Sequence, residues 1–139
     1  MKKIELIILL FLYLPTFAQK QTELKINITG YSSLKGDIYI AIYNSKELYM
    51  KPEKAVYAGI IQPLANSTTY TIAAVPDGIY AATIFHDKNK NGKLDFNFLG
   101  IPKEKIGFSN NAKGFFGAPS FNETKFYHKG NQEINIKLE

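Results

Sequence analysis

The chain has 139 residues and a formal net charge of +5, which corresponds to one mildly basic domain. All of its 17 basic residues are lysine, and no cysteine occurs. Arginine makes most bidentate contacts to phosphates and base edges, so scattered lysines without arginine predict no binding of nucleic acid. The absence of cysteine excludes disulfide bonds, thiolate catalysis and a lipid-modified cysteine anchor.

The N-terminus has the three parts of a secretory signal peptide. Lys2 and Lys3 give a positive start, residues 4–14 are mostly apolar, and Thr16 and Ala18 are the small residues before a predicted cut. The apolar run is too short to span a bilayer about 30 Å thick as a helix, although a signal anchor or a buried helix is an alternative. We therefore expect a signal peptide over residues 1–18 and a mature domain over residues 19–139. That domain is expected in the periplasm or outside the cell, with no stable membrane anchor after cleavage.

Apolar and polar residues alternate through most of the mature part. Such a period of two, interrupted by turn residues, is typical of short half-buried strands. Residues 79–86 are the most apolar stretch and are expected at the centre of a sheet, and His128–Asn131 is expected to join the last two strands as a hairpin. The predicted strands cover residues 22–29, 37–43, 55–62, 68–75, 79–86, 126–127 and 133–138. About seven strands of this kind predict an all-β fold, a single antiparallel β-sandwich of immunoglobulin size.

No strand pattern is visible for about thirty residues after His86. A loop of this length inside a compact domain is usually functional or ordered by something else. Its start, residues 87–95, places oxygen-bearing side chains at alternate positions around Gly92. If the first residue of this stretch is position 1 of a calcium loop, the ligands would be the side chains at positions 1, 3, 5 and 9 and the backbone carbonyl at position 7. These positions hold Asp87, Asn89, Asn91, Asp95 and, for the carbonyl, Lys93.

The predicted calcium loop lacks one ligand. An EF-hand has a bidentate glutamate at position 12, where this chain has Phe98. Glu104, Asn97 or water would have to complete the set, so we expect weak affinity, on the order of 10⁻⁴ to 10⁻³ M, as in extracellular modules. The alternative is a metal-free turn in which Asn and Asp side chains bond to their own backbone. An EF-hand proper is not expected, because a strand enters the loop and no helix leaves it.

The two histidines are weak candidates for catalysis. His86 stands beside Asp87 and could act as a base or a metal ligand, which leaves a hydrolase around His86 as an alternative. However, the chain has no serine in a nucleophile elbow, no cysteine and no organic cofactor motif. We expect a non-catalytic protein in which His86 orders the loop by hydrogen bonding, and in which His128 is structural.

Aromatic residues are frequent in and after the long loop. We expect most of them to form a small core under the loop, because a long loop needs its own packing. Phe115 and Phe116, which lie between two glycines, are the pair expected to be exposed. They are therefore the candidate residues for a second kind of function, a module that binds a small ligand, a glycan or an envelope protein without metal.

Five blocks of the mature chain resemble the DUF2141 family of small exported bacterial proteins. The blocks are Gly78–Ala81, His86–Asp95, Gly100–Glu104, Gly107–Asn111 and Pro119–Phe121. The resemblance implies a transthyretin-like or immunoglobulin-like sandwich, and it implies no reaction, substrate or catalytic residue. The leading hypothesis from the sequence is thus an exported, non-catalytic sandwich with a calcium-ordered loop.

Overall fold

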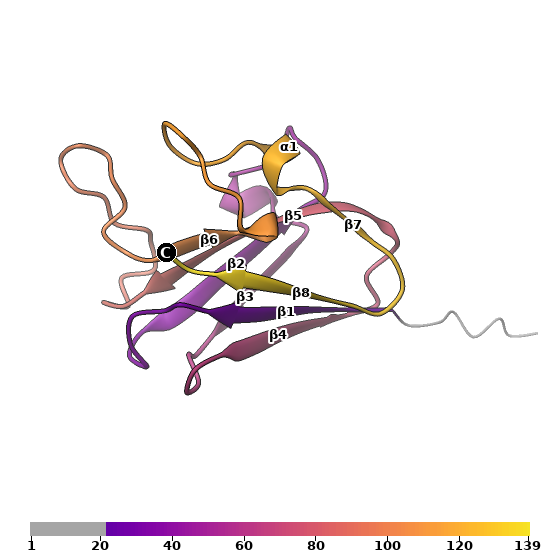
Figure 1. Cartoon of the computed structure of the whole chain (residues 1–139), viewed down its shortest axis with the longest axis horizontal. Coiled ribbons are helices and arrows are strands. Elements are labelled where there is room, and N and C mark those ends of the chain that lie inside the picture. The colour runs from indigo at the N-terminus through magenta and orange to yellow at the C-terminus, as the bar shows by residue number, and fades with distance from the viewer. Residues whose placement is uncertain (1–21) are drawn as a thin grey trace, which may run out of the picture.

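The computed structural model describes residues 22–139 as a β-sandwich with little helix (Figure 1). The predicted signal peptide, residues 1–18, lies outside the described residues. The strands are β1 (Glu23–Thr29), β2 (Asp37–Tyr43), β3 (Tyr57–Ile61), β4 (Thr68–Ala73), β5 (Gly78–Asp87), β6 (Ile106–Phe108), β7 (Phe126–His128) and β8 (Gln132–Lys137). Two 3₁₀ helices, η1 (Pro52–Lys54) and η2 (Ser109–Asn111), and one short helix, α1 (Phe121–Thr124), complete the described elements.

The strands form two sheets. One has the order β4-β1-β8, and the other has the order β3-β2-β5-β6, with β7 also paired to β5. The alternating residues of β1, Leu24, Ile26 and Ile28, are fully buried, and those of β2 and β5 that face the core are buried as well. This confirms the all-β prediction, and it confirms the central place of β5, which pairs with β2, β6 and β7.

The pairing of the last strands differs from the sequence prediction. His128–Asn131 does not join a hairpin, because β7 pairs with β5 while β8 pairs with β1. The β1–β8 pair is parallel, whereas the other strand pairs are antiparallel. The residues of this turn indicate a change of chain direction, which the structure has. They do not determine which strand each flanking segment pairs with. The chain crosses from one sheet to the other at this turn.

The segment between β5 and β7 is less irregular than its sequence suggests. It contains β6, which continues the larger sheet, followed by η2 and α1. Two loops remain within it, and Figure 1 shows both standing clear of the sandwich on the same side. No helix within residues 22–139 is long and apolar enough to cross a bilayer.

Candidate functional site

The predicted calcium loop begins at the buried end of β5. Asp87 is the last residue of that strand and its side chain is fully buried. Its Oδ1 accepts a hydrogen bond from the backbone N–H of Asn91 at 3.2 Å, and its Oδ2 accepts one from Gly92 at 2.7 Å. Gly92 has a φ of +79°, a conformation that glycine adopts without strain. One carboxylate therefore fixes the turn of the whole loop.

The other predicted ligands converge on Asp95. The side-chain amides of Asn89 and Asn91 each donate to Asp95 Oδ2 at 2.7 Å. Their own oxygens accept backbone N–H groups two residues further on, from Asn91 and Lys93, at 3.1 Å each. These last bonds are the Asx turns of the metal-free alternative. They use one lone pair of each amide oxygen, and a carbonyl oxygen has two.

Asp95 carries the charge of this cluster. The hydrogen bond from Asn89 is the largest cause that holds the pKa of Asp95 below its ordinary value, and Asn91, Lys93 and Lys103 act in the same direction. Asp95 is therefore an anion at neutral pH. Lys93 is exposed, and Lys90 turns away to pair with Asp37 at 3.3 Å. The lysines between the predicted ligands thus do not enter the cluster.

Glu104 returns to the loop, as the sequence prediction required, but it bonds to the backbone there. Its Oε1 accepts from the N–H of Lys88 at 3.1 Å and its Oε2 from the N–H of Asp95 at 3.3 Å. Across residues 22–139, no group of three or more histidine, aspartate or glutamate side chains is arranged to hold a metal ion. Glu104 therefore fastens the two ends of the loop together and does not form a three-carboxylate cluster with Asp87 and Asp95.

The two histidines occupy opposite ends of β5. His86 lies next to the loop, while His128 pairs with Gly78 at the start of the strand. Eight residues of strand separate these positions by roughly 26 Å, so the histidines cannot act on one substrate atom. His86 is buried, its Nε2 lies 2.7 Å from the carbonyl oxygen of Lys35, and its backbone N–H donates to Lys105. His86 thus joins three segments at the base of the loop.

The comparisons with known proteins agree with the resemblance seen in the sequence. The family model described as "Uncharacterized protein conserved in bacteria (DUF2141)" matches residues 26–136. The chain belongs to the DUF2141 family. No curated protein and no solved structure matches it.

The aromatic residues of this DUF2141 protein do not form the expected small core under the loop. Phe108 and Phe121 are buried, but Phe98 is 95% exposed and Phe96 is more than half exposed. The prediction that most of these aromatics are core is therefore wrong for the residues of the projecting loops. Phe115 and Phe116 are 91% and 97% exposed, as the sequence indicated for this pair. Turn geometry in both loops directs these side chains outward, and composition alone does not reveal that direction.

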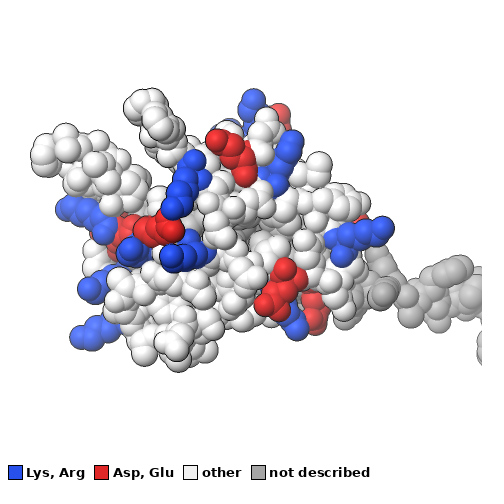
Figure 2. All heavy atoms as spheres, viewed as in Figure 1, with Lys and Arg blue, Asp and Glu red and all other residues white. Residues whose placement is uncertain are grey.

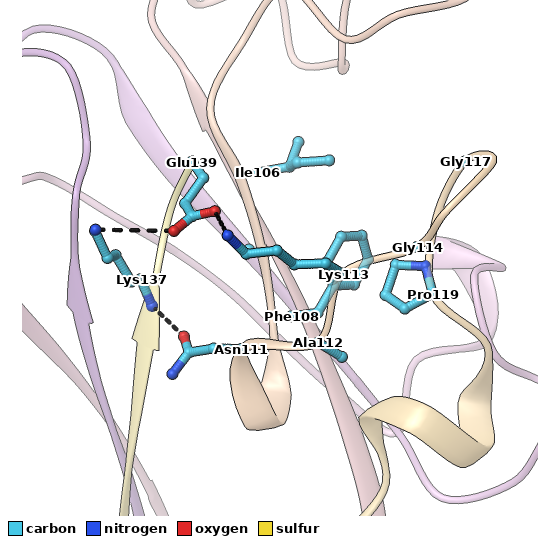
Figure 3. A pocket seen from close by; sticks show the side chains of 11 residues that line it. Ile106, Phe108, Asn111, Ala112, Lys113, Gly114, Gly117, Pro119, Lys137 and Glu139 are labelled. Carbon is cyan, nitrogen blue, oxygen red and sulfur yellow. Dashed lines mark hydrogen bonds and ion pairs between the residues drawn. The ribbon is translucent and has the colours of Figure 1, made fainter.

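A hollow of about 230 Å³ lies below the loop that carries Phe115 (Figure 3). Residues of β6, of η2 and of the loop line it, whereas Phe115 and Phe116 do not. Lys113 reaches into it and pairs with Glu139 at 2.5 Å, and Lys137 approaches the same carboxylate at 3.8 Å. A solvent-exposed ion pair is therefore part of the lining of the hollow, and the exposed phenylalanines are not.

One buried polar residue of this DUF2141 protein has a role that the sequence did not indicate. Ser109 is fully buried, its Oγ accepts the backbone N–H of Ala82 at 2.9 Å and donates to the carbonyl of Thr124 at 2.5 Å. It thereby connects β5 to α1 across η2. A single serine within an Asn-rich segment gives no sequence signal for such a position.

Proposed function

We propose that this protein is an exported, non-catalytic β-sandwich domain whose loop from Asp87 to Asp95 binds calcium weakly. The observation that carries the proposal is the convergence of Asn89 and Asn91 on one ionised carboxylate oxygen of Asp95, beside a turn fixed by buried Asp87. Four side chains with oxygen atoms from alternate positions thus lie in one small loop. Carboxylate and amide oxygens are the ligands that calcium prefers.

The carboxylates of the loop favour a cation, whereas the charges of Lys93 and Lys103, which act on Asp95, oppose one. The two amide groups direct partial positive charge at Asp95 Oδ2, which is the role that a bound cation would take over. Rotation of each amide about its last side-chain bond would turn its oxygen toward the cation, at the cost of the hydrogen bonds that these oxygens accept from the N–H groups of Asn91 and Lys93. Asp87 and Asp95 together supply two negative charges, and Lys90 is held by Asp37.

The same geometry limits the affinity. Calcium takes six to eight oxygen ligands, and Glu104 uses both of its oxygens on backbone N–H groups. Water would have to fill the remaining positions, so we place the dissociation constant on the order of 10⁻⁴ to 10⁻³ M, the range of extracellular modules. Free calcium reaches that range outside the cytoplasm, which agrees with the proposed export through residues 1–18.

The biological effect of calcium would be to hold the loop that follows. The carbonyl oxygen of Asp95 accepts the N–H of Lys103 at 2.8 Å, and Phe96 forms a bridge with Pro102. A cation that fixes Asp95 therefore also fixes the base of the projecting loop 96–102. His86 and His128, at opposite ends of β5, supply no acid–base pair for a reaction.

Calorimetry with calcium tests this proposal, and melting temperatures in calcium and in excess chelator give a second readout. At a calcium concentration ten times the dissociation constant, linkage adds about 1.4 kcal/mol of stability. For a domain of this size that raises the melting temperature by roughly 5 °C. No heat of binding, no terbium luminescence and no shift at about ten times the upper end of the affinity range would overturn it.

Asp95→Asn is the informative variant, because it preserves shape and removes one charge from the cluster. It should abolish the calcium-dependent shift. Glu133→Gln is the matched control: Glu133 is an exposed acid on β8, in the other sheet from β5, and it changes the net charge by the same amount. Loss of the shift in both variants would show only a general charge effect and would contradict the assigned site.

A further inference from the structure

Two loops next to β6 carry the most exposed apolar side chains of residues 22–139. We name them the Phe98 loop, residues 96–102, and the Phe115 loop, residues 113–118. Phe98, Phe115 and Phe116 are each more than nine-tenths exposed, and Phe96, Leu99 and Ile101 are more than half exposed. In Figure 2 the two loops are separate uncharged protrusions on the same side of the protein. Exposed apolar groups gathered in this way mark an interaction surface.

The Phe98 loop is held in one conformation. Asn97 Oδ1 accepts the N–H groups of Leu99 and Ile101 at 2.9 and 3.0 Å, and Asn97 N–H donates to the carbonyl of Ile101 at 2.9 Å. Gly100 takes a φ of +76° at the turn. Phe98 stands at the tip of this closed turn. Its exposure is thus built into the loop by Asn97.

The Phe115 loop is tight for a different reason. A Cβ on Gly114 would clash with the carbonyl oxygen of Gly117, so the backbone closes on itself between these glycines. Phe115 and Phe116 occupy the tip, with their rings edge to face and 4.7 Å between centroids. Both loops therefore present phenylalanine to the solvent at low entropic cost to a later binding step.

Lysines outnumber acids in the chain segments around the two loops. No acid occurs in residues 96–103 or 112–119, and residues 93–113 contain four lysines and two acids, a net charge of +2. Glu104 is engaged by backbone N–H groups and Glu139 by Lys113. Figure 2 shows lysines, with acidic residues among them, at the bases of the protrusions, behind the uncharged tips. The partner must accept apolar tips and, behind them, a net excess of positive charge.

We propose that the Phe98 loop and the Phe115 loop insert reversibly into the surface of an anionic lipid bilayer. Aromatic side chains are favoured at the boundary between headgroups and hydrocarbon, and lysines just above it are attracted to anionic headgroups. A protein partner of ordinary size needs about 800 Å² of matched, continuous surface per side, whereas these tips are two separate protrusions. A fluid bilayer accepts separate protrusions without shape complementarity. The proposal goes beyond calcium binding and does not depend on it.

Single tryptophans report insertion directly, because the chain contains no tryptophan. Phe98→Trp and Phe115→Trp are mixed with vesicles of phosphatidylcholine, with or without phosphatidylglycerol. Emission should shift to the blue and become protected from an aqueous quencher with anionic vesicles, and salt should weaken the effect. The control is Leu64→Trp, an exposed apolar position in the turn between β3 and β4, which should show no shift.

Flotation of the purified protein with the same vesicles measures affinity. Phe98→Ser, and the double variant Phe115→Ser with Phe116→Ser, should each lower vesicle affinity about tenfold or more, while Leu64→Ser should leave it unchanged. Because all four side chains are exposed, melting temperatures should stay close to that of the unchanged protein. Binding in chelator or in calcium supports insertion, provided that Phe98→Ser removes it.

Three results would overturn the proposal. The first is no flotation with anionic vesicles in either buffer. The second is flotation that depends on Leu64 as strongly as on Phe98. The third is binding of a glycan or an envelope protein through Phe115 and Phe116 without any binding to vesicles, which would assign the surface to the other class of partner. None of these results bears on calorimetry with calcium, so the two proposals fail separately.

Discussion

Asp87→Ala measures how much of the loop's stability depends on one buried carboxylate. The side chain is fully buried and accepts N–H groups from Asn91 and Gly92. A hydrogen bond to a charged group contributes about 1.5–3 kcal/mol. Both donors lie on exposed residues, so water replaces part of each bond, and removal of a buried charge offsets part of the rest. We expect a net loss of about 2 kcal/mol in chelator.

Calcium should enlarge this loss, because the unchanged protein gains linkage energy that the variant lacks. At a calcium concentration ten times the dissociation constant, the loss of stability caused by Asp87→Ala grows by about 1.4 kcal/mol. Urea denaturation in chelator and in calcium measures both values, provided that the denaturant slope stays constant. Asp95→Asn separates the two effects, since it should remove the calcium increment and cost much less in chelator.

Two outcomes would contradict the reasoning on Asp87. A loss below about 0.5 kcal/mol in chelator, the level of an ordinary surface substitution, would show that the carboxylate does not fix the turn. A loss of equal size in both buffers would leave the stability argument intact and refute the calcium site.

Three further predictions concern the sandwich itself. Ser109→Ala leaves a buried N–H and a buried carbonyl without their partner, and it should cost about 2–4 kcal/mol in urea denaturation; a loss under about 1 kcal/mol would contradict the bridging role. His128→Leu should raise stability by about 1 kcal/mol, because both ring nitrogens are buried without a partner within residues 22–139, and a loss would show that the ring is satisfied. Burial raises the pKa of several tyrosines above its ordinary value of 10. The stability that these neutral side chains contribute is therefore present below pH 10 and is lost as the pH rises through their pKa values in the folded protein. Circular dichroism with an ultraviolet tyrosine titration should show unfolding coupled to ionisation, and ionisation without unfolding would contradict the prediction. These tyrosines are Tyr31, Tyr43, Tyr49 and Tyr80.

The strands were predictable because a strand that is buried on one face alternates apolar and polar residues with a period of two. Leu24, Ile26 and Ile28 alternate with polar residues, and all three are fully buried. The partners of the strands were not predictable in the same way. His128 ends β7 in one sheet and Gln132 begins β8 in the other, and no local pattern distinguishes this crossing from a hairpin.

The candidate site was predictable where ligand spacing is local. The interval from Asp87 to Asp95 predicted a compact loop, and the side chains do meet there. Glu104 accepts hydrogen bonds from the N–H groups of Lys88 and Asp95 because the chain returns after the Phe98 loop. The sequence indicated that Glu104 could lie near the loop, but it did not indicate that Glu104 would bond to the backbone there. The exposure of Phe98 follows from the turn around Asn97, which overrides the usual tendency of phenylalanine to be buried.

The parallel pairing of β1 with β8 sets the time at which the molecule can fold. Asn27 donates to Asn135 at 2.9 Å across 108 residues of chain. Contacts between such distant segments are slow to form, because the entropy of closing the intervening chain is lost first. During synthesis, β1 can pair with β4 early, but its other edge stays open until Gln132–Lys137 have been made. The newly made chain therefore depends on protection of one edge of β1 until β8 has been made, and a chain truncated before β8 would be prone to aggregate through that edge.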